Sequence, residues 1–207
     1  MRTDQINSSL EVSISRARLH KYLENQGHDL DLAIGLYERN MRLSAAFYPE
    51  LQALEVCLRN KLHDQMRTTY GAAWLRGSGT PLEASATAAI EDAWNELSKP
   101  DSEKTSGDII AELKFSFWVG MLATKYDETL WRQACHKAFP NFKGRRSVVH
   151  GRLNAIRRFR NRVAHHEPIF HKDLQRIHSE VIEAIGWMCR DTQKWSASLS
   201  SVGHLLK

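Results

Sequence analysis

Apolar residues return every three or four positions along this chain, and no segment alternates apolar and polar residues with a period of two. One long stretch of this kind runs from Glu50 to about Gly71. Its apolar positions are Leu51, Leu54, Leu58, Leu62 and Met66. This spacing places the side chains on one face of an α-helix. The pattern therefore predicts an all-α fold, a bundle of long antiparallel helices.

Capping and turn residues divide the rest of the chain. Ser13 or Ser15 caps a helix that ends at Gly27, and Asp29 opens the next one. Pro49 either starts a new helix or kinks a continuous one. Further helices are expected over residues 82–97, 109–126, 128–139, 147–165 and from 174 to about 195. Loops are expected at residues 76–81 and 98–107, the second of them exposed and mobile.

The length of 207 residues predicts one domain over residues 1–207, of which residues 1–12 are expected to be loosely ordered. Cys57, Cys135 and Cys189 lie far apart without a zinc-binding spacing, which favours reduced thiols in a reducing compartment. Residues 1–15 lack the apolar core of a signal peptide, and no run of about 18 apolar residues occurs. We therefore expect a cytoplasmic protein without a membrane span.

Positive charge gathers in one part of the sequence. The net charge is +5 with a pI near 9.2. Between Lys143 and Arg176 the only acidic residues are Glu167 and Asp173. The basic residues of this segment are Lys143, Arg145, Arg146, Arg152, Arg157, Arg158, Arg160, Arg162, Lys172 and Arg176. The segment is either a solvated helix face or a surface that binds a polyanion.

The same segment contains an arginine on an apolar stripe. At 100° per residue, one arc of the helix holds Val149, Leu153, Ile156, Phe159 and Val163. Arg160 falls inside this arc, and an unpaired guanidinium is costly to bury, so we expect Arg160 to have a partner. His165 lies about 140° further round an ideal helix, whereas Asn161 and His165 share a face. The arginine can therefore meet a histidine by reaching back at the helix end or across a dimer.

The spacing of Arg160, Asn161 and His165 resembles the signature of the HEPN superfamily, whose catalytic members are metal-independent ribonucleases. The longer string RNRVAHHEPIF looks more narrowly like the Abi-like family of bacterial abortive-infection proteins. Two further segments, ALEVCLRNKL and ELKFSFWVGML, are similar to helices of that family and occur in the same order. Together they extend the resemblance from about Arg16 to Trp187. It implies an HEPN-like helical bundle with additional helices.

The resemblance implies a role for each motif residue. Metal-independent RNA cleavage needs an acid or base near neutral pH and a cation at the phosphorane. His165 would transfer protons, Arg160 would stabilise charge and Asn161 would orient the reacting groups, giving a 2′,3′-cyclic phosphate without a cofactor or metal ion. Possible supporting residues are His166, Glu55 and Arg59. Candidate RNA-binding residues are Arg145, Arg146, Arg152, Arg157, Arg158 and Arg162.

The resemblance also implies partners. HEPN nucleases generally pair two motifs across a homodimer, which would complete a site that has one arginine and one histidine per chain. A free nuclease would kill its host, so restraint by a partner such as an antitoxin, by an inhibitory RNA or by an inactive assembly is expected. In HEPN toxins modified by nucleotidyltransferase antitoxins a tyrosine stands two positions after the histidine. Glu167 stands there in this chain, a departure that argues against such modification.

Three alternatives to a nuclease stay open at this point. The first is a non-catalytic HEPN module that binds RNA or another protein. The second is a metal site built from His165, His166 and His171, although adjacent histidines rarely share one ion. The third is a DNA-binding module that uses the basic helix, for which the sequence contains no specific reading motif.

Overall fold

The computed structural model describes residues 2–76, 79–97 and 105–206, and within them it contains helices and turns but no strand, as the periodicity predicts. The α-helices are α1 (Asp4–Ile14), α2 (Arg16–Asn25), α3 (Leu30–Tyr70), α4 (Ala84–Glu96), α5 (Ser106–Glu112), α6 (Phe115–Gly120), α7 (Arg146–Ala164), α8 (Leu174–Met188), α9 (Arg190–Leu199) and α10 (Val202–Leu205). Parts of both expected loops, residues 77–78 and 98–104, lie outside the described residues. Among the described helices, none combines the length and apolar character that a bilayer span requires.

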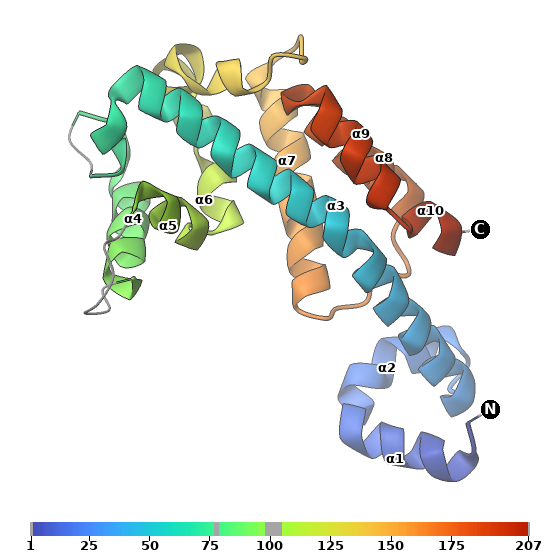
Figure 1. Cartoon of the computed structure of the whole chain (residues 1–207). Helices are drawn as coiled ribbons and strands as arrows, with labels where there is room; N and C mark the ends of the chain where they lie inside the picture. The colour runs from blue at the N-terminus through green and yellow to red at the C-terminus, as the bar shows by residue number, and fades with distance from the viewer. Residues whose placement is uncertain (1, 77–78, 98–104, 207) are drawn as a thin grey trace.

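The 41-residue helix α3 is the axis of the molecule. Figure 1 shows α1 and α2 at its N-terminal end, α4 to α6 near its C-terminal end, and α7 to α10 along its middle. Asp29 caps its start, since Asp29 Oδ1 accepts from the Leu32 N–H at 3.0 Å, and Gly71 ends it. Pro49 lies inside the helix and on its exposed side, so the continuous alternative is the one observed. Phe47 and Leu51 on either side of the proline are buried.

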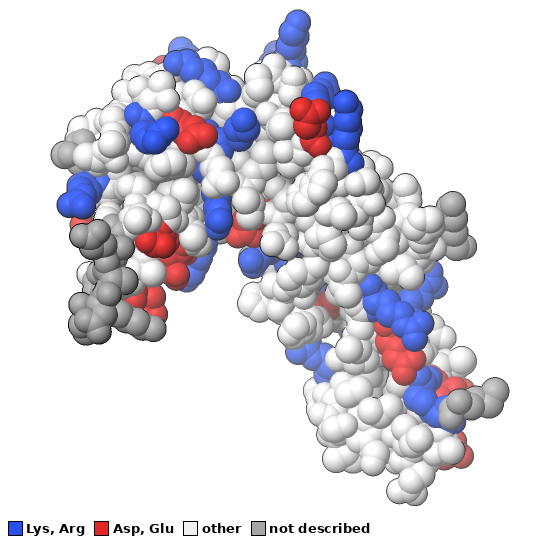
Figure 2. Space-filling view, in the orientation of Figure 1, with Lys and Arg blue, Asp and Glu red and all other residues white. Residues whose placement is uncertain are grey.

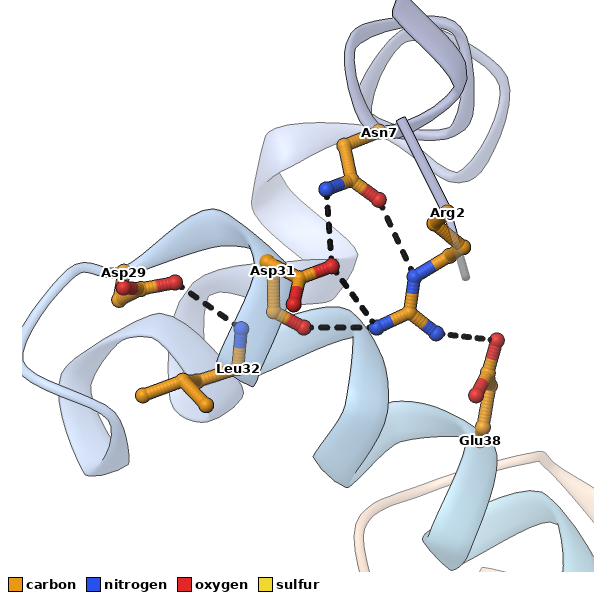
Figure 3. Close-up of polar contacts among 6 residues, drawn as sticks. All are labelled: Arg2, Asn7, Asp29, Asp31, Leu32 and Glu38. Carbon is orange, nitrogen blue, oxygen red and sulfur yellow. Dashed lines mark hydrogen bonds and ion pairs between the residues drawn. The ribbon is translucent and has the colours of Figure 1, made fainter. Parts of the chain in front are cut away.

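Residues Asp4–Ile14 form helix α1, whereas residues 1–12 are expected from the sequence to be loosely ordered. Arg2 ties α1 to α3 in the network drawn in Figure 3. Its guanidinium donates to Asn7 Oδ1 at 3.1 Å and to the Asp31 carbonyl at 2.8 Å, and it pairs with the Glu38 carboxylate. Asn7 Nδ2 also donates to Asp31 Oδ1 at 2.9 Å. A polar network of this kind leaves no apolar periodicity in the sequence, which is why the pattern missed it.

Two clusters of apolar side chains hold the helices together. The smaller cluster lies where α1 and α2 fold against the start of α3, and its buried residues are Leu19, Tyr22, Leu23, Ala33 and Ile34. The larger cluster surrounds the middle and the C-terminal half of α3 and takes residues from α4 to α8 and from α10. It includes the whole predicted stripe of α7, with Val149, Leu153 and Ile156 each at most 2% exposed.

Three helices expected from the sequence are interrupted in the structure. The segment 109–126 breaks at Leu113, which is extended and 5% exposed, and Trp118 Nε1 donates to its carbonyl at 3.3 Å. The segment 128–139 is a π-helical turn, Asp127–Trp131, followed by a 3-10 turn, Cys135–Ala138. The last helix breaks at the extended Cys189, and α9 folds back on α8.

Candidate active site

Helix α7 brings Arg160 against the middle of α3. The rings of Phe159 and Phe47 lie with centroids 4.8 Å apart and fix the crossing of the two helices. One position further on, Arg160 lies at the edge of the core with its side chain 40% exposed. Its Nε lies 3.3 Å from Glu55 Oε2, so the partner expected for the arginine on the apolar stripe is a carboxylate of α3.

A cavity of about 190 Å³ opens beside this ion pair. It is lined by Tyr48, Leu51, Gln52, Glu55, Val56, Arg59, Arg160, Val163 and Ala164. Arg59 contributes a second guanidinium, and its Nε is buried without a hydrogen-bond partner in the described residues. Two guanidinium groups thus face one carboxylate, and the cavity has an excess of positive charge that suits a phosphate oxygen.

His165 lies outside this cavity, so the structure does not bring it together with Arg160 there within a single chain. Helix α7 stays regular to Ala164, and His165 is its exposed C-cap, with its N–H donating to the Asn161 carbonyl at 2.9 Å. Five residues of regular helix turn the side chains apart by about 140°. The alternative in which Arg160 reaches back to His165 is not observed, because its guanidinium is held by Glu55.

Hydrogen bonds and an ion pair hold the chain that follows α7, where the exposed His165 and His166 lie. His166 has a left-handed backbone with φ of 57°, and Arg18 Nη1 donates to its carbonyl at 3.2 Å. Arg162 Nη1 lies 3.0 Å from Glu167 Oε2, and Nη2 donates to the Pro168 carbonyl at 3.1 Å. Arg162, a candidate for RNA binding from the sequence, is therefore engaged within its own chain.

Asn40 of α3 fastens the same loop from the other side and was missed as a site residue by the sequence reasoning. Its Oδ1 accepts from the N–H groups of Ile169 at 2.7 Å and Phe170 at 3.2 Å, and its Nδ2 donates to the Glu167 carbonyl at 3.4 Å. The side chain is almost fully buried. The available signal was an asparagine on the same helical face as Ala33, a position at which an apolar residue is the norm.

Replacing Asn40 with alanine is expected to destabilise the protein by about 1–3 kcal/mol, because buried N–H groups of the loop lose their acceptor. The loss should appear as a lower urea midpoint, and amide hydrogen exchange should be faster at Ile169 and Phe170. Asn25→Ala, on the exposed last turn of α2, is the matched control. An unchanged rate of amide hydrogen exchange at Ile169 in the Asn40→Ala variant would show that the Asn40 hydrogen bonds do not hold the loop.

The other arginines proposed for RNA binding divide into side chains with a polar contact inside the chain and exposed side chains without one among the described residues. Arg146 donates to Asp127 Oδ1 at 2.9 Å and to the Leu122 carbonyl at 2.6 Å. Arg152 donates to Glu183 Oε2 at 2.7 Å, and Arg157 donates to Asn154 Oδ1 at 3.0 Å. Of the six candidates, the remaining two, Arg145 and Arg158, are exposed.

In Figure 2 the basic residues do not form one continuous face. Lys and Arg lie over both ends of the molecule in this view, with Asp and Glu among them. The concentration of positive charge in the sequence from residue 143 to 176 is thus partly neutralised in the fold by Asp127, Glu183 and Glu55.

No group of three or more His, Cys, Asp and Glu side chains in the described part of the chain is arranged to hold a metal ion. The alternative built from His165, His166 and His171 therefore has no such group to support it. Comparisons with protein-family models, with curated proteins and with solved structures find no match for this chain.

Proposed function

We propose that this protein is a metal-independent endoribonuclease whose active site is shared between two copies of the chain. The observation that carries the proposal is the placement of Arg160, half-exposed beside a small cationic cavity, with His165 exposed at the end of the same helix. Within one chain these groups diverge. A second copy of α7 would supply the missing histidine to each arginine.

The chemistry follows from the residue types. The His165 imidazole can take the 2′-hydroxyl proton of RNA or protonate the leaving 5′-oxygen, since an imidazole exchanges protons near neutral pH. Arg160 can stabilise the pentavalent phosphorane through bidentate hydrogen bonds, once its guanidinium turns from Glu55 to the phosphate. Asn161 lies on the face of α7 that ends at His165 and would orient the imidazole or a phosphate oxygen. The products are a 2′,3′-cyclic phosphate and a 5′-hydroxyl.

By its resemblance to the Abi-like family, the enzyme would act as a toxin or abortive-infection effector against phage. The ion pair between Glu55 and Arg160 supports a restrained resting state, because a carboxylate occupies donors that the phosphate needs. An antitoxin or inhibitory RNA would hold this state in the cell.

Purified full-length protein is expected to cleave single-stranded RNA in the presence of EDTA and to leave fragments with 2′,3′-cyclic phosphate ends. End-labelled RNA separated on a gel shows the cleavage, and acid treatment identifies the cyclic ends. The matched substrate is the same RNA with 2′-O-methyl groups, which cannot provide the attacking hydroxyl. Cleavage of the methylated strand, or cleavage that EDTA abolishes, would rule out this mechanism.

Sharing of the site between chains has its own test. Arg160→Ala and His165→Ala proteins, each inactive alone, are mixed and allowed to exchange subunits. Random pairing of a two-fold dimer gives half heterodimers, each with one intact composite site, and about a quarter of wild-type activity returns. Sites formed within one chain would recover nothing on mixing.

A second candidate function is a non-catalytic module that binds RNA or a protein. Its supporting observation is the same divergence of Arg160 and His165, together with the occupied Arg160 guanidinium. RNA that is bound but never cut in the EDTA experiment would favour this candidate.

A further inference from the structure

A second and larger hollow, of about 710 Å³, lies away from the Arg160 cavity. Its walls are the end of α2, the N-terminal half of α3, the loop that leads into α8, and α10, which packs against α3 (Figure 1). The two hollows share no lining residue. Its volume falls within the range of about 300–1,000 Å³ that is typical of small-molecule sites.

The polar rim of this hollow carries uncompensated positive charge. Arg39 of α3 and Lys172 of the loop line it, both are exposed, and neither side chain has a partner among the described residues. The only acidic residue in the lining is Asp173, which is already used as the N-cap of α8: its Oδ1 accepts from the Arg176 N–H at 3.1 Å.

His171, which also lines the hollow, lies in the same region of excess positive charge. The pKa of His171 is lowered, first by partial burial and then by the nearby charges of Lys172, Arg162 and Lys21. Arg162 is paired with Glu167, whereas Lys21 and Lys172 have no ion-pair partner among the described residues, and a bound anion would relieve the repulsion between such charges. The first turn of the 15-residue helix α8 also opens here and adds the positive end of its dipole.

The floor of the hollow is apolar and contains an aromatic ring. Its apolar lining consists of Leu36, Leu43, Phe170, Leu174 and Leu206. Phe170 is half-buried, and its ring lies against that of Tyr22 with the ring centroids 5.2 Å apart. Asn25, Gln26 and Gln175 place amide groups around the same space. An aromatic ring beside amide groups suits a flat heterocycle, which stacks on the ring and forms hydrogen bonds at its edge.

We propose that this hollow is a binding site for a nucleoside phosphate. The base lies against Phe170 and the leucine floor, and the phosphates lie at Arg39 and Lys172 near the start of α8. A fatty acid fits the charges but not the walls, because amide side chains interrupt the apolar surface. The proposal is independent of the nuclease, since Arg160, Asn161 and His165 do not line this hollow.

The test is a titration of the full-length protein with ADP, followed by calorimetry, with adenosine and inorganic pyrophosphate as the matched half-ligands. ADP is expected to bind saturably at one site, and each half-ligand is expected to bind at least about tenfold more weakly. Pyrophosphate that binds as tightly as ADP would reduce the site to an anion patch and overturn the proposal. Absence of saturable ADP binding at millimolar concentration would also overturn it.

Variants locate the ligand in the hollow. Arg39→Ala combined with Lys172→Ala should weaken ADP binding by at least about tenfold, and Phe170→Leu should weaken ADP but leave pyrophosphate binding unchanged. Arg67→Ala combined with Lys194→Ala, which removes two exposed cations outside the hollow, is the charge-matched control. Thermal unfolding of each variant in the absence of ligand separates loss of binding from loss of folding. Equal ADP affinity in the double variant and the wild type would place the ligand elsewhere and defeat the assignment.

Discussion

Replacing His165 with alanine is expected to slow RNA cleavage by roughly 10²–10⁴-fold, the usual contribution of a general acid or base. His165 is exposed and its side chain holds no contact that the fold needs, so the variant should unfold at the wild-type temperature. The rate is measured under single-turnover conditions on a labelled RNA in EDTA. His20→Ala, an exposed histidine of α2, is the matched control and should cleave at the wild-type rate. A His165→Ala protein that cleaves as fast as the wild type would end the proposal that this residue transfers the proton.

Arg160 tests the other half of the same site. Arg160→Lys keeps the charge but loses the bidentate geometry, and it should lower the cleavage rate by a factor of about 10²–10³, comparable to the loss of one oxyanion donor. Glu55→Gln has the opposite expected sign, because an amide holds the guanidinium less strongly and leaves it free for phosphate. If Glu55→Gln is instead slower and less stable than the wild type, Glu55 positions Arg160 for catalysis and does not restrain it.

The helical class and the apolar stripes could be predicted from the sequence because burial of one helix face imposes a period on the residues. Val149 to Val163 obey that period, and all five positions of the stripe are buried. The breaks at Leu113 and Cys189 could not be predicted, because they depend on tertiary contacts. Trp118 covers the carbonyl exposed at Leu113, and the side chain of Gln193 packs against Gly186 where α9 returns on α8.

The candidate site likewise has features that could be predicted from the sequence and features that could not. The sequence places Arg160 on the apolar stripe and thereby predicts a partner for it, since burial of an unpaired guanidinium is unfavourable. The sequence does not identify the contacts between Asn40 and the loop after α7, because Asn40 lies 127 or more positions from the backbone groups that it binds. The two cations of the larger hollow, Arg39 and Lys172, come together only when the loop after the motif folds against α3.

Replacing Glu50 with alanine is expected to destabilise the fold by about 3 kcal/mol, the lower end of the range for breaking a buried pair. Glu50 is fully buried in the middle of α3. Its Oε2 lies 2.8 Å from His178 Nδ1 of α8 and accepts from Ser200 Oγ at 2.8 Å, at the end of α9. Removal of the carboxylate leaves both partners without their contact. Urea unfolding measures the loss, and Glu183→Ala, an exposed carboxylate of α8, is the control. A loss below about 1 kcal/mol would show that the three elements are held together without it.

The charge of Glu50 makes stability depend on pH with a definite sign. Burial raises the pKa of this carboxyl above its ordinary value of about 4.5, and the contacts with His178 and Ser200 offset only part of the increase. The folded protein therefore holds the Glu50 proton more tightly than the unfolded chain, and the contribution of this group to stability falls as pH rises above about 4.5. Glu50→Gln keeps the shape without the titration. The free energy of unfolding of the wild type, relative to that of Glu50→Gln, is thus expected to decrease between about pH 4 and pH 7. A difference that grows over this interval would mean that the ion pair with His178 outweighs desolvation and that Glu50 is ionised in the core.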